Sequence, residues 1–545
     1  MATKPLRLLA QLDAIPDELA LSGPATFRQY LLDGELRTWN GPMQDIFSPI
    51  FVESAPGPKR QLLGACPVHD SHVGEEALRA ATAAWDKGLG SWPNLPASAR
   101  MACVEDFCRR MRAKRAEIVR LMVWEICKSR KESEQEFDRT IEYIDDTLAE
   151  LRRMQEQNAQ PQRVGGMQAH SGQSPFGVVL CMGPFNFPLN ETLATLIPAL
   201  LMGNTAVVKL PRIGRLLFFP LMDCFHKAFP RGVVNILSGG IETVTPIMAS
   251  GLVDALAFIG TSRAAEAMRA LHPHPNRLRC VLGLEAKNAA IILPDADLDI
   301  AVPEVLRGSF GFNGQRCTAI KLIFVARQVA ETFLERFTGA VAELHCGLPW
   351  EPGVNITPLP EPGKPKFLQA LRADALAKGA QELIPGVGLP SEQPGGMDDA
   401  ETFFAPSLLF PVTPDMRVFH EEQFGPIAPV ALFDDPQEAL RAIAASSYGQ
   451  QASIFGSDPQ QLAELSRRLH NLVSRVNINC KCQRGPDELP FTARRDSAVG
   501  TLSVRDGLLA FSLPTLTVLR DKPATQAANE RIALALAGPG SQNGA

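Results

Sequence analysis

Residues 178–284 alternate between short apolar runs and amphipathic segments, and this alternation constrains the fold more than any other feature of the chain. The apolar runs are VVLCM, TAVVKL, GVVNIL, ALAFIG and RCVLGL, and the segments between them have helical spacing. Continuous apolar strands that alternate with helices are typical of a parallel sheet covered on both faces. The sequence therefore predicts an α/β protein that binds ligands beyond the carboxyl ends of its strands.

A second alternation, from AAIIL at 289 to RVNIN at 479, predicts a second α/β unit. Before the first unit, residues 70–155 have apolar residues at three- and four-residue spacing, which predicts long helices. Between 156 and 174 this period gives way to Pro and Gly, which indicates a loop or exposed hairpin. After Lys522 the residues are small and polar, and we expect a mobile tail.

Composition excludes several classes of protein. With 545 residues, of which 45% are hydrophobic and 21% charged, the chain is long enough for two or three domains. A net charge of -5 provides no basic field for nucleic acid, and the apolar runs are shorter than the ~20 residues of a membrane helix. Eleven irregularly spaced cysteines and no leader-like N-terminus favour a cytoplasmic protein with free thiols.

Three loops beside predicted strands have unusual chemistry. MGPFNFPLN places Asn186 in a turn bracketed by prolines, where it either projects into a site or is an ordinary turn residue. GFNGQRCTAIK places Cys317 directly before a strand, as a nucleophile or as a buried apolar filler. EEQFGP, residues 421–426, has an acidic pair before a Gly-Pro turn, although acidic loop residues are usually only solvated. Cys480 and Cys482 have no second Cys/His pair nearby, so we predict no metal site.

Taken together, these motifs resemble the aldehyde dehydrogenase superfamily in order and spacing from about residue 30 to 515. The motifs are PFNFP, VVKLP, FIGTS, RCVLGLEAKN, GQRCTA and EEQFGP. FNGQRCTAIK, NITPL, EEQFGP and QRGPDELPF are most similar to the non-phosphorylating, NADP-dependent glyceraldehyde-3-phosphate dehydrogenases of this superfamily. The resemblance implies a Rossmann-type cofactor domain, an α/β catalytic domain and a small β bridging element.

The resemblance also implies domain boundaries. Residues 25–155 and 175–288 would form the cofactor-binding domain and residues 289–500 the catalytic domain. Residues 156–174 and 501–522 would form a bridging and oligomerisation element, followed by a mobile tail at 523–545. An exposed apolar strand near the C-terminus needs a partner edge, so we expect a homodimer or homotetramer.

In this family a thiolate at the position of Cys317 attacks the aldehyde. The resemblance assigns the stabilisation of the oxyanion to the Asn186 side chain and the Cys317 backbone N–H. Hydride transfer to the cofactor then leaves a thioester on Cys317, which water must hydrolyse.

The cofactor site is expected without a GxGxxG motif, because none follows a strand here. The resemblance assigns cofactor binding to Lys209, Thr261, Leu284, Glu422 and Phe424. Arg212 stands where NAD-preferring relatives usually carry Glu, and a guanidinium there attracts a 2′-phosphate. We therefore expect NADP, with NAD possible; the alternative is that Arg212 is an ordinary surface arginine.

Arg139, Arg316 and Arg484 match arginines that bind the substrate phosphate in the glyceraldehyde-3-phosphate branch. Arginine forks suit phosphate oxygens, and Arg316 could also lower the pKa of the neighbouring thiol. Phe187 stands where the family has a phosphate-site tyrosine. Losing this hydroxyl weakens phosphate binding and could favour a less polar aldehyde.

The largest departure from the family lies in RCVLGLEAKN. Relatives carry there a glutamate that activates the deacylating water, whereas this chain has Gly283. Glu285 is displaced by roughly 6–7 Å along the strand, so it is either a substitute base or part of a structural ion pair.

The sequence thus predicts NADP-dependent oxidation of an aldehyde, with glyceraldehyde 3-phosphate as the leading substrate. The reaction would pass through a Cys317 thioester, with impaired or altered deacylation. Two alternatives stay open: acyl transfer to coenzyme A, and a catalytically weak relative that binds nucleotide.

Overall fold

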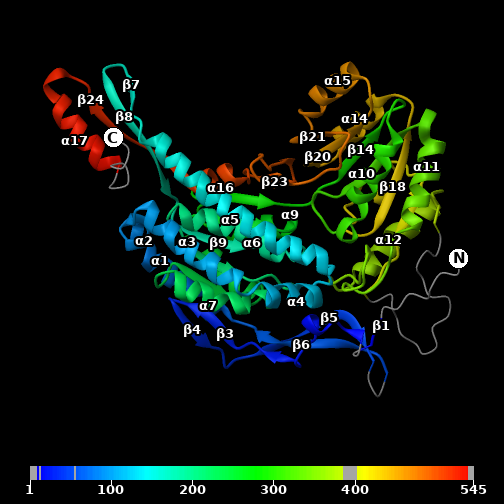
Figure 1. The fold of residues 1–545 in the computed structure, drawn as a ribbon, viewed down its shortest axis with the longest axis horizontal. Coiled ribbons are helices and arrows are strands. Elements are labelled where there is room, and N and C mark those ends of the chain that lie inside the picture. The colour runs from blue at the N-terminus through cyan, green and yellow to red at the C-terminus, as the bar shows by residue number, and fades with distance from the viewer. Residues whose placement is uncertain (1–8, 12–13, 54–56, 385–401, 538–545) are drawn as a thin grey trace.

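Two α/β bodies and a projecting arm make up the computed structural model, which describes residues 9–11, 14–53, 57–384 and 402–537 (Figure 1). The first body contains an eight-stranded sheet with the order β23-β13-β12-β9-β10-β11-β3-β4. The second contains a seven-stranded sheet with the order β16-β17-β18-β15-β14-β20-β21. The prediction of two α/β units is confirmed.

The first sheet has a parallel centre and antiparallel edges. Its parallel strands are β9 (Val178–Met182), β10 (Thr205–Lys209), β11 (Val234–Leu237), β12 (Ala255–Ile259) and β13 (Arg279–Gly283). The antiparallel strands are β3 (Gln29–Leu32), β4 (Glu35–Thr38) and β23 (Ala498–Val499). The chain passes from β9 to β10 and β11 on one side, then returns to β12 and β13 on the other. The carboxyl ends of β9 and β12 therefore form a topological switch point, where such sheets bind ligands.

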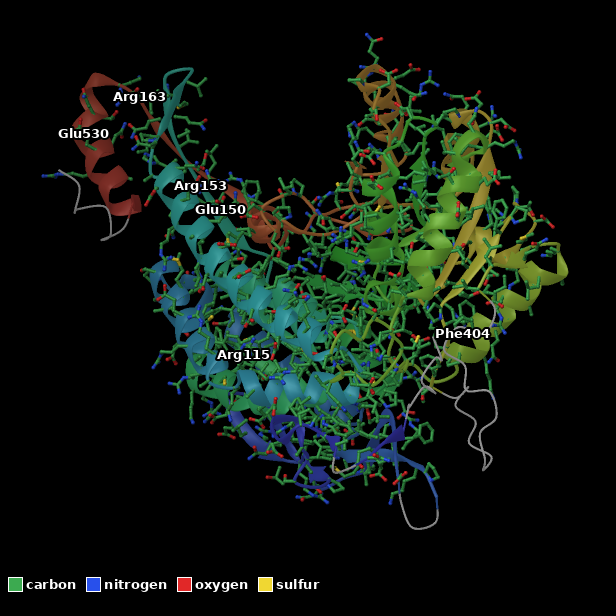
Figure 2. All side chains as sticks on the ribbon, turned by 45° about the vertical axis from the view of Figure 1, so that its right-hand side comes forward. Arg115, Glu150, Arg153, Arg163, Phe404 and Glu530 are labelled. Atoms are coloured by element: carbon green, nitrogen blue, oxygen red, sulfur yellow. The ribbon has the colours of Figure 1, made fainter. Side chains whose placement is uncertain are left out.

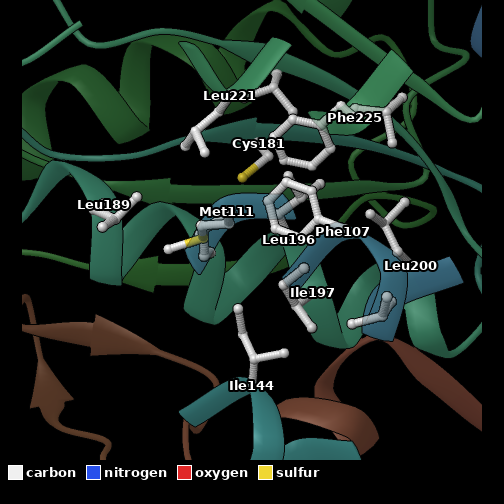
Figure 3. Close-up of a cluster of buried hydrophobic side chains, with 14 of the residues drawn as sticks. Phe107, Met111, Ile144, Cys181, Leu189, Leu196, Ile197, Leu200, Leu221 and Phe225 are labelled. Carbon is white, nitrogen blue, oxygen red and sulfur yellow. The ribbon is translucent and has the colours of Figure 1, made fainter. Parts of the chain in front are cut away.

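Helices cover both faces of this sheet. They are α1 (Ser71–Trp85), α3 (Ala97–Arg112), α4 (Arg115–Glu125), α5 (Arg130–Asn158), α6 (Pro188–Leu201), α7 (Phe219–Ala228), α8 (Ile241–Ala249) and α9 (Ser262–Leu271). Figure 3 shows the core between α3, α5, α6 and α7, where the rings of Phe107 and Phe225 stack with centroids 4.2 Å apart. Every residue of α6 is buried, including its few polar side chains. Any charge on α6 therefore needs a partner inside the protein.

The second sheet is built from strands that are buried along most of their length. Its strands are β14 (Asn288–Ile292), β15 (Ile320–Ala326), β16 (Gln381–Glu382), β17 (Ser407–Phe410), β18 (Ile427–Phe433), β20 (Gln451–Phe455) and β21 (Arg475–Ile478). All neighbours except β16 and β17 pair in parallel. The helices α10 (Leu298–Phe310), α11 (Arg327–Ala342), α12 (Lys364–Ala377), α14 (Pro436–Ala445) and α15 (Pro459–Leu469) belong to this body.

The arm combines two segments that are distant in sequence. The hairpin β7 (Gln162–Val164) and β8 (Met167–Pro175) pairs with β24 (Ser512–Arg520), and α17 (Gln526–Ala537) follows. Figure 2 shows Arg163 and Glu530 on this arm, away from Phe404 in the second body. The hairpin expected between 156 and 174 is thus present.

Two features of the fold are not predicted from the sequence. Residues 526–537, which lie in the segment that we expect to be a mobile tail, form the helix α17. Ala, Leu, Glu and Arg favour a helix there even though the composition resembles a linker. A four-stranded sheet of β1 (Leu9–Ala10), β2 (Ala25–Thr26), β5 (Met43–Val52) and β6 (Lys59–Pro67) was not foreseen. Within the described part of the chain, no helix is both long and apolar enough to span a bilayer.

Candidate active site

A cavity of about 1120 Å³ lies where loops of the two bodies meet. Loops after β9, β10, β12 and β13 line it from the first body, and the segments at 316–318, 361–364, 421–424 and 483–485 line it from the other side. The residues singled out in the sequence all line this cavity: Arg139, Asn186, Phe187, Lys209, Arg212, Thr261, Leu284, Glu285, Arg316, Cys317, Glu422, Phe424 and Arg484. Residues separated by more than 300 positions in the sequence thus surround one space.

The turn before Cys317 is fixed by backbone geometry. Gly314 has φ 68°, and a Cβ there would lie 2.6 Å from the carbonyl oxygen of Gly425. Glycine is therefore required at this position. Asn288 Nδ2 and Lys321 Nζ donate to the Cys317 carbonyl oxygen over 2.8 and 2.9 Å, which anchors the backbone of the cysteine.

Cys317 lines the cavity and is partly exposed to it, and charged side chains of both signs lie near its thiol. Burial is the largest effect and raises the pKa of its thiol, and Glu191 raises it further. The charges of Lys321 and Arg484 act in the opposite direction and lower the pKa of the thiol. The fraction of Cys317 present as thiolate therefore depends on the balance between these two cations and the nearby carboxylates.

Asn186 is 7% exposed and lies beside the cysteine turn. Its Nδ2 donates to the Gln315 carbonyl oxygen over 2.8 Å, two residues before Cys317. An amide nitrogen carries two hydrogens, so the second remains available for an oxyanion. The position is thus suited to the role that the sequence resemblance implies.

A buried ion pair holds the Asn186 turn in place. Lys128 Nζ pairs with Glu136 and donates to the Asn186 carbonyl oxygen over 2.7 Å. Glu136 Oε1 accepts the N–H groups of Leu189 and Asn190, both over 3.1 Å, at the start of α6. The Lys128 ammonium also lies 3.5 Å from the centre of the Phe187 ring. One cation thus connects α5, the start of α6 and the turn that carries Asn186.

Each of the three arginines proposed for phosphate already has protein partners. Arg139 makes two hydrogen bonds to Asp487, over 2.8 and 2.7 Å. Arg484 pairs with Glu191, and its Nε lies 3.5 Å from Asp487. Arg316 Nη2 donates to two carbonyl oxygens at the end of α10, over 2.9 and 2.8 Å. Arg316 Nε and Arg484 Nη2 are buried and have no hydrogen-bond partner among the described residues.

Lys209 and Arg212, which follow each other closely at the end of β10, give their part of the cavity wall a basic character. Burial, with the charges of Arg215 and Arg212, lowers the pKa of Lys209 to about 8. Arg212 is exposed and its guanidinium has no carboxylate partner in the described part of the chain. An anionic ligand would therefore find two adjacent cations that no carboxylate of the described segments neutralises.

Helix α9 begins at the edge of the same cavity. The Thr261 side chain caps it by accepting the Ala264 N–H over 3.3 Å. Glu285 Oε2 accepts the Ser262 N–H over 2.7 Å. Two of the N–H groups that a helix N-terminus offers to an anion are thus already occupied by side chains.

Glu422 is held between the cavity and the second sheet. It pairs with the buried Lys321 ammonium and accepts the Ala286 N–H over 3.1 Å. Phe424 adopts φ 44°, and the Lys321 ammonium lies 5.7 Å from its ring centre. Lys321 therefore connects the Cys317 carbonyl to the Glu422 end of the cavity.

The model of the aldehyde dehydrogenase family matches residues 53–515 of this chain. The chain belongs to the aldehyde dehydrogenase family. Its matches include the NADP-dependent glyceraldehyde-3-phosphate dehydrogenase of Apium graveolens, 33% identical over 350 residues, or 63% of this chain and 66% of that protein. The protein with the same description from Zea mays is 27% identical over 521 residues, or 92% of this chain and 98% of that protein.

Solved structures agree with this assignment. The NADP-dependent glyceraldehyde-3-phosphate dehydrogenase from Bacillus halodurans C-125, complexed with NADP, superposes with a TM-score of 0.80 and 29% identity. The match covers 91% of this chain and 99% of that chain. The expected aldehyde dehydrogenase fold is confirmed.

Glu191 of this aldehyde dehydrogenase is a site residue that the sequence did not single out. It lies in the first turn of α6, its side chain is 11% exposed, and it lines the cavity together with Cys317. The available signal was a charged residue directly before the largely apolar run TLATLIPALL, because carboxylates are seldom buried without a partner.

The other cysteines of the aldehyde dehydrogenase show no metal site. All eleven cysteines lie in the described segments, and none forms a disulfide. Within those segments, no group of three or more His, Cys, Asp or Glu residues is placed to hold a metal ion. Cys482 lies beside the Ser453 hydroxyl, with 3.2 Å between Sγ and Oγ.

We expect Lys128→Met to lower the free energy of unfolding by about 3–5 kcal/mol, because it leaves the Glu136 carboxylate buried without its cation. Urea denaturation followed by circular dichroism measures the change. Lys227→Met is the matched control, because this lysine pairs with Asp223 at the surface, where the side chains are 49% and 46% exposed. The control should change stability by less than about 0.5 kcal/mol; equal effects of both substitutions would contradict the role of the buried pair.

Proposed function

We propose that the protein oxidises an aldehyde to a carboxylic acid with NADP, through a thioester on Cys317. The observation that carries this proposal is the single cavity that joins Cys317 and Asn186 to the cations Lys209 and Arg212. Nucleophile, oxyanion donor and cofactor residues need to surround one space, because the reacting atoms must meet.

The chain's own residues account for the acylation step. The Cys317 thiolate attacks the carbonyl carbon, and negative charge develops on the carbonyl oxygen. The second N–H of the Asn186 amide and the Cys317 backbone N–H stabilise that charge. The anchored backbone of Cys317 and the pinned turn of Asn186 keep both donors oriented before the substrate arrives.

A further group of residues that line the cavity has the chemistry to bind NADP. Lys209 would lie against the ribose and Arg212 against the 2′-phosphate, while Glu422 and Phe424 would hold the nicotinamide end. When bound, NADP supplies the acceptor for the hydride of the aldehyde. Protonated Lys209 favours the anionic cofactor, so binding should weaken as the pH rises through about 8.

Glyceraldehyde 3-phosphate is the leading substrate. Three arginines line the cavity near Cys317, and two of their buried nitrogens, Arg316 Nε and Arg484 Nη2, have no acceptor among the described residues. Phosphate oxygens are well suited to accept from such groups. The descriptions of the Apium graveolens and Zea mays relatives name the same substrate.

An unphosphorylated aldehyde is the second candidate, and the carboxylates around the arginines favour it. Asp487 and Glu191 already neutralise much of the charge on Arg139 and Arg484. A phosphate would have to compete with both. Phe187, packed on Lys128, offers no hydroxyl to help it.

We also propose a homodimer or homotetramer formed through the arm. Leu513, Leu516 and Val518 of β24 are 42%, 62% and 47% exposed, and a strand seldom leaves so many large apolar side chains uncovered. Light scattering after size exclusion tests this, and a monomeric mass at micromolar concentration would refute it.

The cofactor prediction concerns Arg212→Glu. Replacing a phosphate-binding guanidinium by a carboxylate should lower the ratio of kcat/KM for NADP over NAD by about 10- to 100-fold. Arg277→Glu is the control, since this arginine is exposed and does not line the cavity. An unchanged ratio in Arg212→Glu would show that Arg212 is an ordinary surface residue.

The substrate prediction uses a panel of aldehydes assayed with both cofactors, in which burst and steady state are recorded separately. We expect an NADPH burst with the preferred aldehyde, and no burst in Cys317→Ala. A preference of at least tenfold for glyceraldehyde 3-phosphate over glyceraldehyde supports the leading candidate; equal rates support the second. Turnover that needs added coenzyme A would instead identify a CoA-acylating aldehyde dehydrogenase.

A further inference from the structure

A second, much smaller cavity lies beside Gly283 and Cys317. It leaves about 20 Å³ for the centre of a water molecule, and one water needs about 10–15 Å³. Gly283, Leu284, Cys317 and Glu191 line it, together with apolar and neutral residues of the 491–502 segment. Among the described residues that line it, Glu191 is the one carboxylate. The space therefore has room for a single water molecule, which would touch both Cys317 and the Glu191 carboxylate.

Gly283 leaves this space open without being required by the backbone. Gly283 is not among the residues with positive φ. A Cβ at this position would lie 3.4 and 3.5 Å from the nearest atoms of Ile259, which is ordinary contact. The missing side chain is thus a chemical departure from the family, and not a steric necessity.

Arg484 holds the Glu191 carboxylate in a defined orientation. Its Nη1 donates to Oε2 of Glu191, and both side chains are buried, 6% and 11% exposed. Oε1 accepts no hydrogen bond from the described residues. The carboxylate therefore has one oxygen fixed by a cation and one oxygen available to a ligand in the cavity.

Glu285 is placed differently. Its carboxylate accepts the Ser262 N–H over 2.7 Å and caps α9. It lines the large cavity but not the small one beside Cys317. Of the two carboxylates near Gly283, Glu191 shares the water-sized space with the nucleophile.

We propose that Glu191 is the general base that hydrolyses the Cys317 thioester, in place of the glutamate that position 283 lacks. This inference rests on the proposed function. The water oxygen bonds to the acyl carbon, and Glu191 Oε1 accepts a proton from that water. The bond between the acyl carbon and sulfur then breaks, and the proton returns to the departing sulfur, so that a carboxylic acid and the free thiol result. No electron is transferred in this step, because the oxidation is complete once the thioester has formed.

The test is Glu191→Gln, with the NADPH burst and the steady state measured in the same experiment. We expect the burst amplitude to stay within twofold of the parent, because acylation does not use the base. Steady-state hydrolysis should fall by about 100-fold or more, the usual effect of losing a general base. Added coenzyme A or dithiothreitol should restore turnover, because the acyl-enzyme still forms. Glu242→Gln is the control, an exposed first-turn glutamate of α8 outside both cavities.

Two further variants keep the test decisive if Glu191→Gln does not fold. Glu191→Asp preserves the charge opposite Arg484, but its side chain is one methylene shorter, so the carboxylate lies farther from the small cavity. This variant should slow hydrolysis while the burst persists. Adding Gly283→Glu to Glu191→Gln or to Glu191→Asp should raise the steady-state rate of hydrolysis at least tenfold above that of the single variant.

The outcomes separate this inference from the proposed function. A parent without a burst, or a fully active Cys317→Ala, would refute the proposed function itself. If the parent shows a burst but Glu191→Gln hydrolyses the thioester normally, or if Glu191→Gln loses the burst as well, the role of Glu191 is refuted and the proposed function stands. If turnover after the burst is lost in Glu285→Gln but not in Glu191→Gln, the general base is Glu285. If the parent itself turns over only with a thiol acceptor, the enzyme has no base for hydrolysis and the role of Glu191 is refuted.

Discussion

The buried ion pair of Lys128 and Glu136 is the interaction on which the site depends. Glu136 satisfies the first N–H groups of α6, and Lys128 holds the carbonyl of Asn186 in the turn just before that helix. In a buried environment neither charge is tolerated without the other, so the turn has one stable geometry. Asn186, the proposed oxyanion donor, is thereby oriented by helices of the first body, while Cys317 is oriented by Asn288 and Lys321 of the second sheet. The proposed catalysis therefore requires that the Asn186 turn of the first body and the Cys317 turn of the second keep their positions at the cavity.

Charge around Cys317 is arranged as a set of neutralised pairs. Arg484 with Glu191, Arg139 with Asp487 and Lys321 with Glu422 each combine a cation with a carboxylate at the cavity wall. This arrangement lets the interior hold many ionised groups without a large net charge. It also has consequences for chemistry, because Glu191 opposes thiolate formation while Arg484 and Lys321 favour it. A carboxylate this close to Cys317, the proposed nucleophile, hinders thiolate formation, and its presence is consistent with the proposed use in a later step of the reaction.

Much of the first sheet and of the site could be predicted from the sequence, for identifiable reasons. Buried parallel strands such as VVLCM and ALAFIG are continuous apolar runs, and their carboxyl ends converge, so the loops after them had to lie near one another. The strands β5 and β6 were missed because their mixture of exposed and buried residues lacks a clean alternation, and α17 because alanine-rich segments read equally as linker or helix. Glu191 was missed because its partner Arg484 lies 293 residues away, and only the folded chain brings the two together.

The account depends most directly on an acyl group carried by Cys317. Rapid acid quenching of the enzyme during its first turnover with glyceraldehyde 3-phosphate and NADP, followed by intact mass measurement and peptide mapping, tests this. The account predicts a mass increase of one acyl group, located on the peptide that contains Cys317 and absent from Cys317→Ala. An adduct on any of the other ten cysteines, or NADPH formation with no adduct in the first turnover, would contradict it.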